Sequence, residues 1–237
     1  GGCAPTEPTS DPVLLHRAPG GGTWESLPLP ASAGCIHHLA FAAPDRGLAA
    51  AGSDLLAWDG AAWRAEGVAP PADPDGAPLE WVRAAHVEVG FGSDGPRDAR
   101  WAVAGRSTWR GYQNGQPPWF SEGGAWGPAT VDDLGLAAVR QADDPDAAAQ
   151  LEGRAFLDLA SDGRHVWSVD GLPQALPAGY LLTTLFELAD GFATLAHPLL
   201  REITDVAVLP DGAVWVAGRE GTRPIVRAPG GEWSAMP

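Results

Sequence analysis

The 237-residue sequence contains no lysine, a single methionine and only two cysteines. All 15 basic residues are therefore arginines, and the 30 acidic residues bring the formal net charge to −15. Because an acidic surface repels phosphate backbones, this balance disfavours DNA or RNA as a partner. No apolar run approaches the roughly 20 residues that a membrane-spanning helix needs.

The sequence also lacks the common catalytic motifs. It has no Gly-x-Ser-x-Gly, no His-Glu-x-x-His and no phosphate-binding loop. The adjacent His37 and His38 would point to opposite faces of a strand, so they could not easily bind one metal ion together. We therefore expect a protein that is not an enzyme and that has no resident cofactor.

Glycine, proline and tryptophan are abundant instead, with 31, 23 and 11 residues. Glycine and proline interrupt the chain too often for long helices. They separate five hairpins, each of which has a short strand, a turn rich in glycine and a second strand that starts with an aromatic residue. These aromatic residues are Trp24, Trp63, Trp126, Phe192 and Trp233. We expect them to pack between neighbouring sheets.

Four of the five hairpins follow another pair of strands. In the last copy, the four strands are expected at Ile203–Leu209, Val214–Gly218, Pro224–Ala228 and Glu232–Ala235. Repeated four-stranded meanders of about 40 residues are typical of β-propeller blades. The sequence therefore predicts an all-β protein with a tether over residues 1–12 and one β-propeller domain over residues 13–237. The propeller has four full blades and an N-terminal two-stranded partial blade.

The ring could close in more than one way. Four blades could form a ring with one extra hairpin. Alternatively, five blades could form a ring in which the tether or another chain fills the incomplete blade. An incomplete blade leaves an open strand edge, and such an edge invites pairing with another chain. The repeats therefore predict a four- to five-bladed propeller that works in an assembly.

The hairpins resemble bacterial propeller repeats that run Gly-x-Ile-x-Arg-Tyr-Asp-Gly-x-x-Trp. The segment LPDGAVWVAG at residues 209–218 is similar to blades of two-component-regulator and photosystem-assembly-factor-like propellers. The resemblance covers nearly the whole chain after Pro12, at the level of the repeat. Such families include sensors, scaffolds, assembly factors and some hydrolases, so the resemblance implies a fold and no single function.

Long insertions are expected at residues 69–80, 106–118, 131–153 and 172–179. In a four-stranded meander, these connections all project from one face of the propeller, and long loops often carry function. Insertion 106–118 is the best candidate for binding, because it combines aromatic rings with amide and guanidinium donors that suit a protein or a glycan. An alternative is that Trp109 packs over the propeller rim. The candidate contact residues are Trp109, Arg110, Tyr112, Asn114, Gln116 and Trp119.

Insertion 131–153 is acidic. Asp143, Asp144 and Asp146 offer oxygen ligands for calcium, but they lack the alternation and the glycine of a calcium-binding loop. A solvated acidic loop is the favoured interpretation.

The two cysteines indicate the compartment. Gly2-Cys3 followed by a proline-rich stretch resembles a bacterial lipoprotein start, in which the cysteine carries a lipid. The alternative is a disulfide between Cys3 and Cys35. Both interpretations place the protein outside the cytoplasm, as a secreted, periplasmic or cell-surface protein. Membrane contact is expected only through a lipid on Cys3.

These observations favour a binding or scaffold module that contacts a protein partner or a glycan through its loop-rich face. The alternative is a sialidase-like glycan hydrolase. DGRHVW at residues 162–167 partly resembles the Asp-box of sialidase propellers, but that box is a structural turn and carries no catalysis. A hydrolase needs two converging carboxylates, or a carboxylate and a tyrosine. The carboxylates considered are scattered among different strands: Asp54, Glu88, Asp158 and Asp205.

Overall fold

A computed structural model describes a large part of the chain. The described residues are 12–17, 20–73, 75–90, 96–108, 111–113, 119–129, 155–161, 166–172, 182–188, 202–209, 211, 213–219, 225–227 and 233–235. All regular structure within these ranges is β-strand, and the strands pair in antiparallel fashion. The expected all-β fold is confirmed. In this part of the chain, no helix has the length and apolarity needed to cross a membrane.

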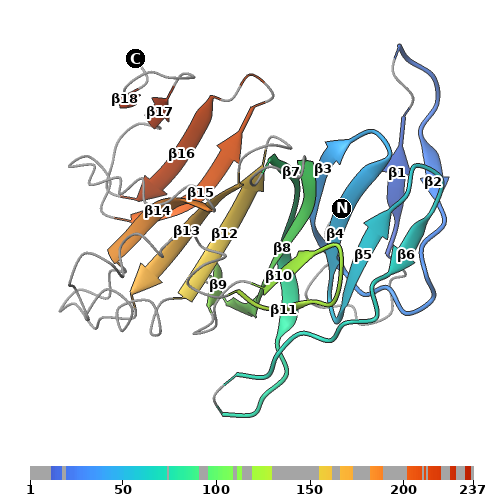
Figure 1. Cartoon of the computed structure of the whole chain (residues 1–237), viewed down its shortest axis with the longest axis horizontal. Coiled ribbons are helices and arrows are strands. Elements are labelled where there is room, and N and C mark those ends of the chain that lie inside the picture. The colour runs from blue at the N-terminus through green and yellow to red at the C-terminus, as the bar shows by residue number, and fades with distance from the viewer. Residues whose placement is uncertain are drawn as a thin grey trace.

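The described strands form five sheets that succeed one another along the chain (Figure 1). The partial blade consists of β1 (Leu14–His16) and β2 (Glu25–Leu27). The first blade consists of β3 (Ile36–Ala43), β4 (Arg46–Ala51), β5 (Asp54–Trp58) and β6 (Trp63–Ala65). The second blade consists of β7 (Glu80–Gly90), β8 (Pro96–Thr108), β10 (Trp119–Glu122) and β11 (Gly127–Pro128), with β9 (Gly111–Gln113) paired to β8.

The third blade has three described strands: β12 (Ala155–Ser161), β13 (Val166–Leu172) and β14 (Leu182–Leu188). Its expected last strand, at Phe192, lies outside the described residues. The fourth blade consists of β15 (Glu202–Val208), β16 (Val214–Arg219), β17 (Ile225–Arg227) and β18 (Trp233–Ala235). The four strands predicted for the last repeat are thus confirmed, with shifts of one or two residues at some ends.

The first strands of the four blades lie close together, as the innermost strands of a propeller do. Strand β7 contacts both β3 and β12, and β12 contacts both β15 and β3. Hydrogen bonds also join these strands: the Ala84 amide donates to His38 Nδ1 at 3.4 Å, and Ser161 Oγ donates to the His86 carbonyl at 3.3 Å. Successive sheets therefore meet at their inner edges, and the chain folds as a β-propeller.

Each innermost strand also carries a β-bulge near its start. In β3, for example, Ile36 pairs with Ala51 and His38 pairs with Ala50, so His37 is the extra residue. Equivalent register shifts occur in β7, β12 and β15. Because a bulge increases local twist, its recurrence gives the four inner strands a common bend.

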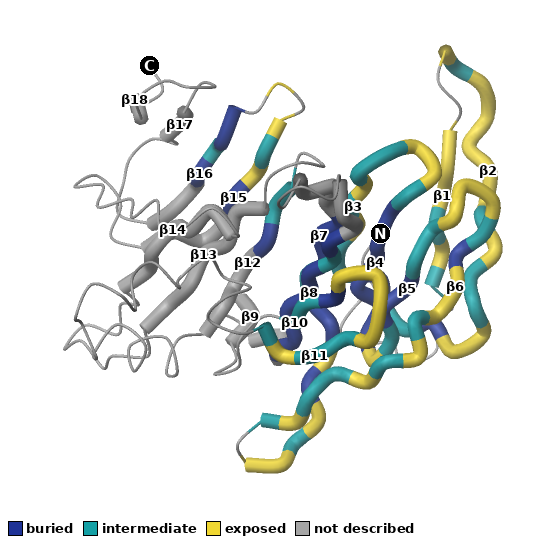
Figure 2. The backbone as a smooth tube through the Cα atoms, viewed as in Figure 1, coloured by how far each residue is buried: buried dark blue, intermediate teal, exposed yellow. Residues whose placement is uncertain are grey.

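The hydrophobic core is divided between the blade interfaces. Strand β4 is buried on both faces, as the dark tube in Figure 2 shows. Leu48 and Ala50 face the second blade, where they pack with Trp81. Ala49 and Ala51 face the partial blade, where Leu14 and Leu27 pack against them. A run of small apolar residues thus serves two cores at once, as expected for a strand between two layers.

The expected packing of the hairpin aromatics is confirmed for Trp63, which is 4% exposed, and wrong for Trp24, which is 62% exposed. Trp126 is half-buried against the core between the first and second blades. Trp24 belongs to the partial blade, whose described apolar side chains pack against the first blade. The side chain of Trp233 and all of Phe192 lie outside what the structure describes.

Two aspartates in turns between strands have structural roles. Asp59 Oδ1 accepts hydrogen bonds from the amides of Ala61 at 3.0 Å and Ala62 at 2.9 Å, and Oδ2 accepts one from Arg64 Nε at 2.8 Å. These bonds, the Ala62 amide first, lower the pKa of Asp59 to about 2. Asp211 Oδ1 accepts from the Ala213 amide in the same way. Each of these two aspartates therefore closes its own turn.

Candidate functional site

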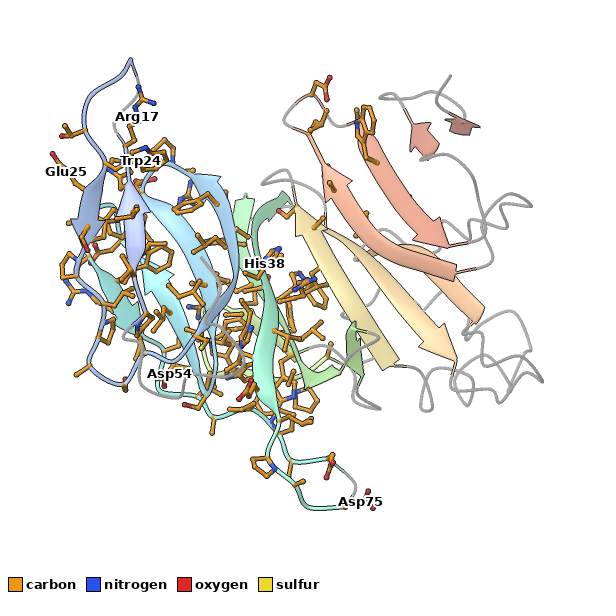
Figure 3. The ribbon with its side chains drawn as sticks, turned by 180° about the vertical axis from the view of Figure 1, so that it is seen from behind. Arg17, Trp24, Glu25, His38, Asp54 and Asp75 are labelled. Carbon is orange, nitrogen blue, oxygen red and sulfur yellow. The ribbon has the colours of Figure 1, made fainter. Side chains whose placement is uncertain are left out.

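The connections between strands differ at the two edges of the sheets. Short turns join β3 to β4 and β15 to β16 at one edge, whereas residues 66–79 form a long connection at the opposite edge (Figure 1). Asp75 lies at the tip of this connection, at the far end of the molecule from Arg17 and Trp24 (Figure 3). We call the edge that carries residues 66–79 the loop-rich face.

Connection 66–79 ends in an ordered turn. The Asp73 amide donates to the Ala77 carbonyl at 2.9 Å, and Asp73 Oδ1 accepts from the Ala77 amide at 2.7 Å. Gly76 has a φ of 79°, a left-handed conformation that favours glycine. Residues 72 and 78 form a β-bridge at the base of the turn. This part of the loop-rich face therefore has a defined backbone shape.

The predicted insertion 106–118 begins as a β-hairpin, which differs from the irregular loop expected there. Arg106 pairs with Gln113, Ser107 with Tyr112, and Thr108 with Gly111. Strand β8 therefore continues past the last residue that pairs with β10, which is Ala102. Strand β9 also contacts β12 of the third blade. We call residues 106–113 the β8–β9 hairpin.

The structure places the six candidate contact residues in three ways. Tyr112 lies on β9 of the β8–β9 hairpin. Trp109 and Arg110 connect β8 to β9, and they lie outside the described residues together with Asn114 and Gln116. Trp119, on β10, is half-buried and makes an edge-to-face contact with Trp81 at 5.6 Å between ring centroids. Its ring is therefore held in the core between the first and second blades.

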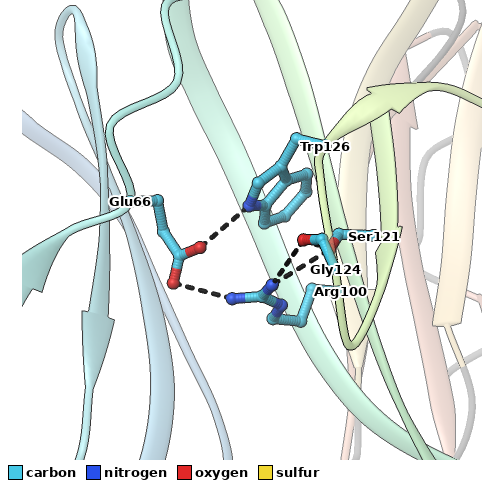
Figure 4. Close-up of polar contacts among 5 residues, drawn as sticks. All are labelled: Glu66, Arg100, Ser121, Gly124 and Trp126. Atoms are coloured by element: carbon cyan, nitrogen blue, oxygen red, sulfur yellow. Dashed lines mark hydrogen bonds and ion pairs between the residues drawn. The ribbon is translucent and has the colours of Figure 1, made fainter.

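A polar network fixes β8 at the interface between the first and second blades (Figure 4). Arg100 Nη1 donates to Glu66 Oε1 at 2.7 Å, and both side chains are only 16% exposed. The other Nη of Arg100 donates to Ser121 Oγ at 2.9 Å, and Trp126 Nε1 donates to Glu66 Oε2 at 3.0 Å. The Arg100 guanidinium also lies 5.2 Å from the centre of the Trp126 ring.

This network satisfies both members of a poorly solvated ion pair, which is the condition under which such a pair is tolerated. The network joins Glu66, which follows β6, to Arg100 on β8 and Ser121 on β10. It therefore holds β8, the strand from which the β8–β9 hairpin extends. We did not identify it from the sequence. The only signal was an arginine directly before the apolar run of residues 101–104.

No metal centre is present in the described part of the chain, where no group of three or more His, Cys, Asp or Glu side chains could hold an ion. His37 Nε2 lies 3.5 Å from Glu80 Oε2, and His38 accepts from the Ala84 amide, so both histidines link β3 to β7. The calcium candidates Asp143, Asp144 and Asp146 lie outside the described residues.

The carboxylates considered for a hydrolase are spread over four blades. Asp54 is on β5, Glu88 on β7, Asp158 on β12 and Asp205 on β15. Asp158 and Asp205 each follow the bulge of an innermost strand. Of these four, only the side chain of Asp54 is described, and it is half-buried.

Cys35 is disulfide-bonded in the structure. Cys3 is the only other cysteine of the chain and lies outside the described residues. The choice between a Cys3–Cys35 disulfide and a lipid on Cys3 therefore stays a prediction.

No model of a known family matches the sequence, and no curated protein sequence matches it. Similar solved structures include YCF48 bound to D1 peptide, with 14% identity, a TM-score of 0.47, and coverage of 92% of this chain and 60% of that one. Another is the extracellular domain of the one component system BT4673 from B. thetaiotaomicron, with 13% identity, a TM-score of 0.41, and coverage of 90% and 23%. A third is PorZ, a surface component of the type-IX secretion system of Porphyromonas gingivalis, with 15% identity, a TM-score of 0.35, and coverage of 80% and 24%.

This chain thus spans at most 60% of the length of these three structures. Identities and TM-scores of this size carry no information on ligands, and the fold assignment rests on the sheets themselves. Those sheets are repeated antiparallel meanders with adjacent first strands. The chain is a β-propeller repeat protein, as its hairpins predict.

Proposed function

We propose that this protein is a non-enzymatic binding module outside the cytoplasm, and that it contacts a protein partner through its loop-rich face within an assembly. The observation that carries the proposal is the β8–β9 hairpin. It extends a core strand past its own blade and is held by main-chain pairing. Residues that are already held by main-chain pairing lose less conformational entropy on binding than an unpaired loop, which favours affinity.

The composition of the hairpin supports a protein partner. Tyr112 lies on β9, and the connection before it contributes Trp109 and Arg110. Tryptophan, tyrosine and arginine are the residues that most often dominate binding energy at protein interfaces. The ordered turn at Asp73 borders the same face and offers a second contact of fixed shape.

Replacing Tyr112 or Trp109 with alanine is expected to weaken binding by roughly 30-fold or more, because truncation of an aromatic hot spot costs at least about 2 kcal/mol. The partner would first be purified from the native source and identified by mass spectrometry. Its affinity for each purified variant would then be measured by isothermal titration calorimetry.

Trp24→Ala is the matched control, because Trp24 is an exposed tryptophan at the opposite end of the molecule. Unchanged affinity in both hairpin variants would contradict the proposed site. Binding to a glycan array that is lost in the same variants would show that the partner is a glycan. Turnover of a glycoside substrate would establish the hydrolase alternative.

The disulfide on Cys35 supports a location outside the cytoplasm, because disulfides persist in oxidising compartments. We expect the intact mass to rise by about 2 Da on reduction. A mass that does not change on reduction, or a diacylglycerol adduct on Cys3, would instead indicate the lipoprotein form.

A further inference from the structure

The partial blade lacks a pairing that the other blades have. In each of the four blades, the third strand of the meander pairs with the second: β5 with β4, β10 with β8, β14 with β13, and β17 with β16. Strand β1 corresponds to such a third strand. Among the described residues it pairs only with β2. One edge of β1 therefore has no strand from this part of the chain.

An exposed apolar surface lies beside that edge. Leu39 pairs with Ala49 and Phe41 pairs with Gly47, and directly paired residues share a face of a sheet. Ala49 belongs to the cluster that Leu14 and Leu27 of the partial blade cover. Leu39 and Phe41 thus lie on the face of the first blade against which the partial blade packs. They remain 39% and 48% exposed.

The positions equivalent to Leu39, one residue after the bulge of each innermost strand, are buried elsewhere in the propeller. Leu159 on β12 is fully buried, and Val206 on β15 is 5% exposed. Leu39 and Phe41 are the inner part of a blade face whose outer part is covered by β1 and β2. The first and second strands of a complete blade would occupy the space in front of them.

The surface is preformed. A Cβ added to Gly47 would lie 2.6 Å from the Phe41 ring, so the ring rests directly on the Gly47 backbone. Phe41 also meets Trp63 edge-on, at 5.9 Å between ring centroids. Its exposed side is therefore a fixed platform.

We propose that a partner polypeptide completes the partial blade with a pair of antiparallel β-strands, which add to the open edge of β1 and cover Leu39 and Phe41. Main-chain hydrogen bonds to a strand edge supply affinity in this mode, and the side chains supply specificity. The repeat indicates the chemistry of the partner: the strand against β1 carries small apolar residues, since Leu48–Ala51 of β4 are completely buried in the same role. The site is separate from the loop-rich face.

The described strands of this chain do not supply the missing pair. The first and second strands of the four blades already pair within their own blades. The tether carries Pro5, Pro8 and Pro12, and proline donates no hydrogen bond to a ladder. The missing pair must have alternating apolar residues and a strand edge that is free to pair with β1.

The test uses the sequence of residues 202–219 as a labelled synthetic peptide, because it forms the first two strands of the fourth blade, β15 and β16. We expect saturable binding to the purified protein in fluorescence polarisation. In the purified protein, the substitution Leu39→Ser is expected to weaken peptide binding by about tenfold or more. Leu209→Ser is the matched control: Leu209 is 41% exposed, lies beside the turn between β15 and β16, and should leave the affinity unchanged.

Hydrogen exchange supplies the second readout. Bound peptide should slow exchange at the amides of Leu14–His16, whereas a peptide with Val206→Pro should not. Absence of binding, or binding that Leu39→Ser leaves intact, would overturn the proposal. The proposal would also be overturned if the β1 amides of the free protein exchange as slowly as those of β4. A segment of the same chain would then occupy the edge of β1. The far-UV circular dichroism of each variant should match that of the parent protein.

Discussion

Replacing Arg100 with alanine is expected to destabilise the protein by about 3–5 kcal/mol, because it leaves a carboxylate at a blade interface without its partner. Glu66 is only 16% exposed and accepts from both Arg100 and Trp126. Loss of the guanidinium also removes the hydrogen bond to Ser121 Oγ. Denaturant unfolding of the parent protein and the variant measures the difference in their free energies of unfolding, provided that both show the same dependence on denaturant concentration.

A double-mutant cycle measures the interaction energy between Glu66 and Arg100 apart from their contacts with other residues. Glu66→Ala alone should also be costly, and the double variant should cost clearly less than the sum of the two single changes. Arg64→Ala is the matched control: the Arg64–Asp59 pair has a similar distance of 2.8 Å but side chains that are 74% and 43% exposed. Exposed ion pairs contribute little, so this change should be close to neutral. If Arg100→Ala and Arg64→Ala lowered the free energy of unfolding equally, the network would not stabilise the interface between the first and second blades.

Trp63→Ala is expected to cost about 3–5 kcal/mol, the usual range for a large buried aromatic. Trp63 is 4% exposed and its ring contacts those of Phe41 and Trp58. Trp24 occupies the same position of the repeat but is 62% exposed, so Trp24→Ala should change stability by no more than about 0.5 kcal/mol. Thermal unfolding of the two variants side by side checks both values.

A further variant refines this prediction. Trp63 Nε1 is buried and has no hydrogen-bond partner in the described structure. Trp63→Phe should therefore lose apolar volume without breaking a polar contact, and its cost should be well below that of Trp63→Ala. Equal stability of Trp63→Ala and Trp24→Ala would contradict the burial of Trp63 between the first blade and the partial blade.

The strands and their order could be predicted from the sequence because both depend on local signals. Alternating apolar residues define a strand, and the glycine or aspartate residues of the turns define where the chain reverses. Asp59 and Asp211 illustrate this directly, since each bonds to amides two or three residues away. The repeats also make the location of the strands more certain, because a strand or turn pattern that is weak in one blade is strong in another.

Features that depend on distant neighbours could not be predicted in the same way. The exposure of Trp24 follows from the absence of a second described neighbour beside the partial blade, which no pattern around residue 24 records. Glu66 and Arg100 are 34 residues apart and meet only when two blades dock. The β8–β9 hairpin was missed because Arg106, Ser107 and Thr108 lack the apolar alternation of a half-buried strand.

Hydrogen exchange of the complex with the purified partner tests the central claim most directly, because it locates the contact on the propeller without any substitution. We predict slower exchange on binding at residues 106–108 and 111–113 of the β8–β9 hairpin and around the Asp73 turn. The short turns at the opposite edge, between β3 and β4 and between β15 and β16, should be unaffected. Protection confined to those short turns, with the β8–β9 hairpin unchanged, would contradict the claim that this propeller binds through its loop-rich face.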